Sequence, residues 1–373
     1  MRISYLSDST LFSGTANIIH VIKMSQALAL QGHSVILHVR AESFYSDLLC
    51  DIADEYGIRP LFKVRAWRIG RFKGSCYVYG VFCGLYAWFS RSSFAYCRSL
   101  PASIVTHCLG LTTVVELHQP LTSTQPAWFI SLLLRVWQGS QKVRFITITV
   151  ALKKYLESKY PECFMSIKVV PDAADEHPLN TRPFPFSQSD QQINVGYCGH
   201  LYPGKGVELI LKLVPLCPWA NFHIVGGTDH DLAKWKSFSD SDSFSNLTWH
   251  GRVPHADIPR FLSSFDVALL PMQFKVATSA SNNSDIASWT SPLKMFEYMA
   301  AGLPIVASDL PVLREVLKHE VNSLLCEPNN PLSWRRQLER LRHCKNLRSR
   351  LGNTAKKEFL ASYNWLSRAR QIL

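Results

Sequence analysis

The feature that most constrains the fold is an alternation of short apolar strands and amphipathic helices. Residues 2–7 form an apolar run, residues 17–30 carry apolar side chains at helical spacing, and residues 34–39 form a second apolar run. A strand, a helix and a strand within about forty residues make a βαβ unit, which requires parallel pairing and a right-handed crossover. Gly32, between the helix and the second strand, suits a helix C-terminus.

The same alternation restarts at Ile193, after a segment of different composition. Residues 173–192 carry three prolines and a run of Ser, Gln and Asp with little periodicity, which is typical of a linker. A chain of 373 residues is also long for a single domain. The sequence therefore predicts an α/β fold with two doubly wound parallel-sheet domains, at residues 1–185 and 186–350, and a final helical segment at 351–373.

Further elements are predicted from the same patterns. In the first half we expect strands at 104–105, 112–117, 145–149 and 168–172, and helices at 128–137 and 150–158. In the second half we expect strands at 193–197, 222–225, 247–250, 267–270, 305–307 and 322–326. The helices expected there lie at 207–214, 258–264, 293–301, 331–343 and 348–359.

The composition is that of a folded globular protein, with 47% hydrophobic and 18% charged residues. Ten cysteines are scattered without CxxC pairs, and no secretory signal pattern follows Met1. We therefore expect reduced thiols that mostly fill the core, in a cytoplasmic protein.

The net charge of +12 is unevenly spread along the chain. Residues 57–115 contain no Asp or Glu but eight Lys or Arg residues, interleaved with aromatic residues such as Trp67, Tyr86 and Trp88. This combination suits an anionic membrane surface, and it would also suit a nucleic acid. The uncharged run at 74–90 is short for a membrane-spanning helix and contains three glycines, so a core helix and a peripheral membrane contact are the two alternatives.

A glycine-rich loop lies between the strand at 193–197 and the helix at 207–214. It reads Gly199-His-Leu-Tyr-Pro-Gly-Lys-Gly206, and Lys205 stands just ahead of a helix whose free N–H groups attract anions. Ligands of parallel sheets bind beyond the carboxyl ends of the strands, where this loop must lie. The pattern is neither the dinucleotide fingerprint nor the P-loop, and a tight turn is the alternative role for its glycines.

A second loop–helix junction lies at 290–301. Thr290-Ser291-Pro292 supplies a cap and a proline near the first turn, while Gly302 and Pro304 end the helix. Lys294 and Glu297 lie three residues apart on one face, where a surface ion pair is the simplest interpretation.

The two junctions together suggest a pocket. If the helix N-terminus faces the glycine-rich loop, Lys205 and the backbone amides near Gly206 and Leu293 converge on one anion. Glu297, one turn further in, would accept hydrogen bonds from vicinal hydroxyls. A diphosphate with a ribose is the ligand that such a pocket describes.

These segments resemble the GT-B glycosyltransferases of family 4. The similarity rests on Gly196–Gly206, Val225–Gly227, His250–Pro254, Asp266–Pro271 and Ser291–Asp309, which follow one another in the order of that family. In the first half it rests on Tyr96–Ser99 and Val114–Pro120, and at the C-terminus on Ser362–Trp365. The resemblance covers essentially the whole chain. It implies a GT-B fold, with a Rossmann-like acceptor-binding domain, a Rossmann-like nucleotide-sugar-binding domain facing it across a central cleft, and a final helix that crosses back to the first domain.

The resemblance also implies roles for single residues. Lys205 would stabilise the donor diphosphate, Glu297 would hold the ribose hydroxyls and His118 would contact the donor sugar, so these three are the expected catalytic residues. The residues expected to bind the donor are Gly14, His200, Gly206, Gly251, Val253, Ser291, Pro292 and Leu293. Gly14 would approach the phosphates and the acceptor, and the backbone at 251–253 would face the base. Lys294 and Asp309 are expected to be structural.

Two positions depart from the family pattern. The family's usual Arg before the diphosphate-binding Lys is His200 here, so half of the cationic clamp is weaker or is supplied elsewhere. The first Glu of the family's E-x7-E motif falls on Trp289, which cannot play that role, and Asp285 is a candidate stand-in. The sugar specificity therefore cannot be predicted from these positions.

The expected activity is a retaining glycosyltransferase that needs no metal or other cofactor. Its partners would be a nucleotide-sugar donor and a glycan, lipid-linked or small-molecule acceptor, with an anionic membrane surface on the cytoplasmic side as a further partner and no nucleic acid. Asp240-Ser-Asp242 fits the D-x-D metal pattern, but turn chemistry explains it better. The alternatives are a nucleotide-sugar epimerase of similar build and a basic nucleic-acid-binding protein.

Overall fold

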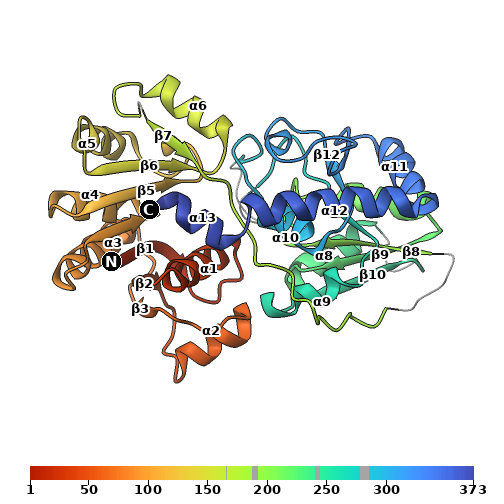
Figure 1. The fold of residues 1–373 in the computed structure, drawn as a ribbon, viewed down its shortest axis with the longest axis horizontal. Coiled ribbons are helices and arrows are strands. Elements are labelled where there is room, and N and C mark those ends of the chain that lie inside the picture. Colours follow the sequence, from red (N-terminus) through yellow and green to blue (C-terminus); the bar gives the residue numbers. More distant parts are fainter. Residues whose placement is uncertain (165, 187–191, 240–243, 278–284) are drawn as a thin grey trace. The chain divides into compact units, whose positions relative to one another are not determined.

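The computed structural model describes residues 1–164, 166–186, 192–239, 244–277 and 285–373, which form two compact units (Figure 1). The first unit comprises residues 1–172 together with 365–373, and the second comprises residues 173–364. The predicted boundary at residue 185 therefore lies within the second unit, because Ser264 Oγ donates a hydrogen bond to Phe184 O and the chain from residue 173 packs there. The chain rejoins the first unit only at Trp365, later than the predicted start of the final segment.

The first unit is built on a parallel sheet with the strand order β3-β2-β1-β4-β5-β6-β7. Its strands are β1 (Arg2–Thr10), β2 (Ser34–Arg40), β3 (Lys63–Trp67), β4 (Phe94–Cys97), β5 (Thr112–Leu117), β6 (Val143–Thr147) and β7 (Ile167–Val169). Its helices are α1 (Ala16–Leu30), α2 (Leu48–Tyr56), α3 (Ser75–Phe89), α4 (Leu100–Cys108), α5 (Ala127–Trp137), α6 (Val150–Lys159) and α13 (Trp365–Ile372). The strand order reverses between β1 and β4, and this switch point is where doubly wound sheets bind ligands.

The second unit repeats this plan with the strand order β10-β9-β8-β11-β12-β13, again all parallel. Its strands are β8 (Ile193–Cys198), β9 (Ala220–Val225), β10 (Leu247–Gly251), β11 (Val267–Leu270), β12 (Ile305–Ser308) and β13 (Leu324–Cys326). Its helices are α7 (Val207–Leu216), α8 (Asp229–Ser239), α9 (Ile258–Leu262), α10 (Leu293–Ala301), α11 (Pro331–His343) and α12 (Lys345–Ser362). The predicted doubly wound α/β architecture is confirmed, and the switch point lies between β8 and β11.

The strand predicted at 104–105 is wrong, because Ile104 and Val105 lie in α4. Pro101 stands in the first turn of this helix, and Val105 packs on Gly84 of α3, where an added Cβ would come within 2.6 Å of the valine Cγ1. An apolar pair is too short to distinguish a strand from a helix by periodicity. The neighbouring strand is β4, which pairs with β1 and β5 and was not predicted.

Helix α10, which was predicted with the bounds observed, is fixed on two sides. The Tyr298 hydroxyl accepts a hydrogen bond from the backbone N–H of Cys198, the last residue of β8, at 2.8 Å. On the other side α10 packs against α12, where a Cβ on Gly352 would lie 2.0 Å from Gly302 O. Gly302 is the left-handed C-cap, with a φ of 71°. These contacts hold the second half of α10 against the end of β8 and against α12.

Candidate functional site

The loop between β8 and α7 is held by close backbone contacts. Gly206 is the N-cap of α7 with a φ of 91°, and a Cβ on it would lie 1.9 Å from Pro271 O. Gly204 has a φ of 80°, and a Cβ there would lie 1.8 Å from Lys275 O. Only glycine fits both positions. The loop is therefore packed against the segment after β11, with Lys205 between its two glycines.

Lys294, on the first turn of α10, reaches across to the end of β8. Its Nζ lies 3.7 Å from the centroid of the Tyr197 ring and would lie 2.4 Å from a Cβ on Gly199. Within the described parts of the chain, neither Lys294 nor Lys205 forms an ion pair with a carboxylate.

The positive charges of Lys205 and Lys294 are unfavourable in the free protein. Burial lowers the pKa of Lys205 to about 8. Burial also holds the pKa of Lys294 well below its usual value, and the nearby charge of Lys205 lowers that pKa further. Because two desolvated cations repel each other, a bound anion would stabilise both.

Glu297, one turn further along α10, does not form the ion pair with Lys294 that the sequence left open. Its Oε1 lies 2.8 Å from His255 Nε2, and 17% of its side chain is exposed. His255 belongs to the short 3-10 helix η3 (His255–Asp257), which follows β10. Sequence reasoning missed His255, because nothing in the pattern links two residues so far apart in the chain. The contact gives the Glu297 carboxylate a fixed orientation.

His200 and the residues before α10 also lie at the carboxyl edge of the second sheet. The imidazole of His200 stacks on Tyr202, with ring centroids 4.6 Å apart and an interplanar angle of 9°. Ser291, Pro292 and Leu293 lead into α10, where Pro292 rather than Ser291 occupies the N-cap position and its own side chain forms no capping hydrogen bond.

Gly251, the last residue of β10, and Val253, just after it, lie at the same edge. Gly251 ends the strand with a φ of 68°, and its carbonyl accepts a hydrogen bond from Gly226 N at 2.7 Å. Val253 is partly buried against an apolar cluster of this unit. The backbone between them directly follows a parallel strand, where ligands of such sheets bind, and its contact with the base stays a prediction.

Asp285 binds backbone amides of the segment before α10. Its Oδ1 accepts hydrogen bonds from Val276 N at 3.0 Å and from Ala287 N at 2.9 Å. Asp285 also lines a cavity of about 570 Å³ together with Lys212 and other residues of this unit. Its role as a stand-in for the family's first Glu, at the position of Trp289, stays a prediction. Asp240 and Asp242, which form the D-x-D pattern, lie outside the described residues.

In the first unit, Gly14 and His118 stand at the carboxyl ends of β1 and β5. Gly14 lies in the loop before α1 with a φ of 67°. His118 Nε2 contacts Glu116 Oε1, and 20% of its side chain is exposed. Burial, together with the charge of Arg98, lowers the pKa of His118 to about 4, so the ring is neutral at neutral pH.

His118 belongs to a buried cluster with His20, Glu116 and Asp172, whose nearest ligand atoms all lie within 4.8 Å of one another. Imidazole and carboxylate groups could bind a divalent cation. However, His20 Nδ1 lies 2.8 Å from Asp172 Oδ1, and Arg368 Nη2 lies 3.1 Å from Glu116 Oε2. Because a guanidinium already neutralises the Glu116 carboxylate, we interpret the cluster as a charge network and not as a metal centre.

The second unit, which carries both lysines and Glu297, is similar to a known family. Residues 181–358 match the family model described as Glycosyl transferases group 1. An uncharacterized glycosyltransferase of Methanocaldococcus jannaschii is 25% identical over 249 residues, which are 62% of this chain and 59% of that protein. The matched part thus spans less than two thirds of the relative's length.

Solved structures resemble the whole chain. Sucrose-phosphate synthase from Thermosynechococcus elongatus has a TM-score of 0.72 at 16% identity, covering 100% of this chain and 97% of its own. Anabaena HepE in complex with UDP and glucose has a TM-score of 0.72 at 15% identity, covering 100% and 98%. At these identities the likeness shows the fold, and the predicted GT-B fold of two Rossmann-like α/β units is confirmed.

Proposed function

We propose that this protein is a retaining glycosyltransferase that transfers a sugar from a nucleotide-diphosphate sugar to a hydroxyl acceptor. The observation that carries the proposal is the grouping of Lys205, Lys294 and Glu297 at the carboxyl edge of the second sheet. Two amines that pair with no carboxylate among the described residues suit a diphosphate, and an oriented carboxylate suits a ribose. The family match of this unit favours a transferase over the epimerase and the nucleic-acid-binding protein.

Lys294 supplies the second cation of the diphosphate site in this proposal. The family's Arg is replaced by His200, whose ring stacks on Tyr202. Lys294 reaches the same end of β8 from α10, with its Nζ against Gly199. This assignment revises the expectation that Lys294 is structural. With two cations in the site, we propose that donor binding needs no metal ion.

The chemical step follows from these charges. The bond between the sugar's anomeric carbon and the diphosphate oxygen breaks, and Lys205 and Lys294 stabilise the charge that develops on the leaving diphosphate. The acceptor hydroxyl forms the new bond on the same face of the sugar and passes its proton to the leaving phosphate oxygen. No protein nucleophile takes part. His118 contacts the sugar, as the resemblance implies.

Stereochemistry tests the proposal directly. Because HepE was solved with UDP, UDP-sugars are the first donors to try, followed by GDP- and dTDP-sugars, each with short glycans and glycerol-type alcohols as acceptors. We expect transfer that persists in EDTA and a product whose anomeric ¹H coupling matches that of the donor. An inverted product, or a requirement for a divalent ion, would contradict the mechanism.

We expect donor affinity to fall at alkaline pH. Lys205 has a pKa of about 8 in the free protein, and a bound dianion raises the pKa of a neighbouring amine, so binding takes up a proton. Affinity for a nucleoside diphosphate is therefore highest below pH 8 and decreases as the pH rises through 8. Calorimetric titrations at pH 7, 8 and 9, in buffers of different ionisation enthalpy, measure both the affinity and the proton uptake. An affinity that is constant over this range would exclude Lys205 from the phosphate site.

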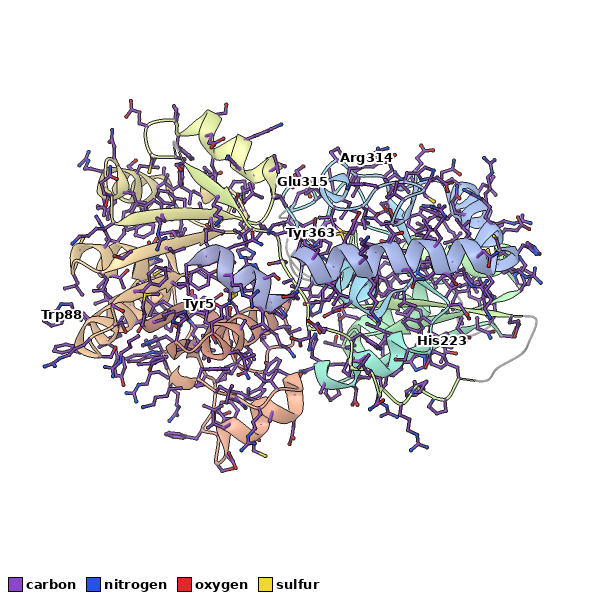
Figure 2. The ribbon with its side chains drawn as sticks, viewed as in Figure 1. Tyr5, Trp88, His223, Arg314, Glu315 and Tyr363 are labelled. Atoms are coloured by element: carbon purple, nitrogen blue, oxygen red, sulfur yellow. The ribbon has the colours of Figure 1, made fainter. Side chains whose placement is uncertain are left out.

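We further propose that helix α3 contacts an anionic membrane. One face of α3 is buried, while its other face exposes Val78, Val81, Phe82, Leu85, Trp88 and Phe89. Trp88, labelled in Figure 2, lies at the outer edge of the first unit with 47% of its surface exposed. Exposed Trp128 on α5 lies beside Tyr77 of α3, with ring centroids 5.5 Å apart. Lys73 and Arg91 stand before and after α3 in the sequence, and the Arg65 guanidinium lies over the ring of Tyr86 on this helix, so basic groups are available for lipid headgroups.

The described helices include none that is long and apolar enough to cross a bilayer. We therefore expect reversible binding. The protein should sediment with vesicles that contain phosphatidylglycerol, less so in high salt, and the double variant Phe82→Ser/Trp88→Ser should remain in the supernatant. Leu360→Ser, at a similarly exposed site on α12, is the matched control. Equal sedimentation of the double variant and the control would show that α3 is not the contact.

A further inference from the structure

The carboxylate of Glu116, on β5, is enclosed by basic groups from α1, from α13 and from the loop that follows β5. His20 Nε2, on α1, lies 3.1 Å from its Oε1, and His118 Nε2 contacts the same oxygen. Arg368 Nη2, on α13, lies 3.1 Å from Oε2. None of the Glu116 side chain is exposed, and only 1% of the Arg368 side chain is. His118, at 20%, is the member of the group that reaches the surface.

Arg368 is held in place by several acceptors besides Glu116. Its Nε donates to Pro171 O at 2.8 Å, and its Nη1 lies 3.2 Å from the hydroxyl of Tyr96. Tyr96 in turn packs against Tyr5 of β1, which is labelled in Figure 2, with ring centroids 4.5 Å apart. Helix α13 therefore brings a rigid cation to Glu116 from the far end of the chain.

The charges in this group keep Glu116 ionised. Burial alone would raise the pKa of Glu116, but the charge of Arg368 and the neighbouring His20 and His118 hold that pKa well below its usual value. A carboxylate accepts hydrogen bonds and cannot donate them. The ring nitrogen of His118 that faces Glu116 must therefore carry the hydrogen. In a neutral imidazole the other nitrogen, Nδ1, is then an acceptor.

We propose that Glu116, locked by Arg368, is a positioning residue that fixes the Nε2–H form of His118, so that His118 presents Nδ1 as an acceptor for a hydroxyl of the bound sugar. The part of this inference that concerns the sugar rests on the proposed function. The part that concerns the ring does not, because Glu116 fixes the tautomer in the free protein. The alternative is that Glu116 and Arg368 form an ion pair that only joins α13 to the sheet.

The tautomer of His118 is tested first, in the absence of a sugar donor. In ¹⁵N-labelled protein at pH 7, long-range ¹H–¹⁵N spectra distinguish a protonated Nε2 from a protonated Nδ1. We expect His118 to be only the Nε2–H form in the wild type and in Glu116→Gln, whose amide oxygen can still accept. In the double variant Glu116→Met/Arg368→Met, which removes both charges of this ion pair together, we expect both tautomers. Arg370→Met, an exposed site on the same helix, is the matched control.

The catalytic consequence is tested by a double-mutant cycle on kcat/KM. We expect Glu116→Met/Arg368→Met to lower kcat/KM about 100-fold in the wild-type background and to have little effect in His118→Ala, because the network then has no ring to orient. Glu116→Gln should retain most of the activity. A purely structural ion pair would give equal losses in both backgrounds.

Three results overturn the inference: a His118 tautomer that is unchanged in the folded double variant, additive losses in the cycle, or stoichiometric Zn²⁺ in the purified wild type, which would make the cluster a metal site. A protein that is inactive with every donor but whose His118 tautomer depends on Glu116 would refute the proposed function alone. The spectra alone would then support the inference that Glu116 positions the His118 ring.

Discussion

Lys205→Met is expected to lower kcat about 1,000-fold, because the variant loses the positive charge that stabilises the leaving diphosphate in the proposed mechanism. Lys205 lies between two glycines whose backbones pack too closely for any other residue, so its main chain is fixed whatever the side chain. Methionine has nearly the length of lysine but carries no charge, so the variant avoids the unfavourable burial of the Lys205 ammonium group. The variant should therefore fold at least as stably as the wild type.

Lys294→Met should behave in the same way with a smaller loss, about 100-fold, because it removes one of two cations. Lys294→Arg should recover part of the activity only if the larger guanidinium fits against Gly199. Lys357→Met, at an exposed position on α12, is the matched control for losing a lysine. Steady-state rates with one donor and a thermal unfolding curve for each variant separate lost catalysis from lost folding. If the folded Lys205→Met variant had wild-type rates, the diphosphate would not bind at this site.

Glu297→Ala is the second variant with a large expected effect. In the proposed site this variant loses two hydrogen bonds from ribose hydroxyls to the Glu297 carboxylate, so kcat/KM should fall about 100-fold. The loss has a specific signature. The wild type should bind a ribonucleoside diphosphate much more tightly than its 2′,3′-dideoxy analogue, and Glu297→Ala should bind the two almost equally.

The contact between Glu297 and His255 provides an internal comparison. His255→Phe keeps the carboxylate but removes the partner at 2.8 Å from it, so a smaller, partial loss of ribose preference is expected. Glu327→Gln, an exposed carboxylate near β13, should match the wild type. A Glu297→Ala variant that still discriminates ribose from dideoxyribose would place the sugar of the nucleotide elsewhere.

Helix α10 shows what the sequence can predict. Its bounds, its left-handed Gly302 and the strand that follows were all expected, because periodicity, a glycine and a proline act locally. The fold class followed from repeating such units. Helix α8, in contrast, was missed, because its sequence is mostly polar and carries no clear apolar stripe.

The contacts that define the site could not be predicted in the same way. The reach of Lys294 to Tyr197 and Gly199 joins α10 to β8, which are distant in sequence. Sequence proximity suggested instead that Lys294 would pair with Glu297. Burial of the lysine by the packed loop, not its spacing along the helix, decides its environment.

One contact in the network around His118, that with Glu116, was predictable from the sequence. Glu116 and His118 are two residues apart at the end of a strand, where alternate side chains share a face. Their proximity could have been expected from that spacing. The contributions of His20, Asp172 and Arg368 could not, because they arrive from three other segments through the fold.

The most direct test of the central claim is the thermal unfolding of the wild-type protein with a panel of nucleotides. Binding to the folded state raises Tm according to the ligand's affinity. We predict that at least one nucleoside diphosphate, at millimolar concentration and pH 7, raises Tm by several degrees while its parent nucleoside does not, and that Lys205→Met removes the difference. If UDP, GDP, ADP, CDP and dTDP all leave Tm unchanged, the pair of lysines is not a diphosphate site and the proposed function is contradicted.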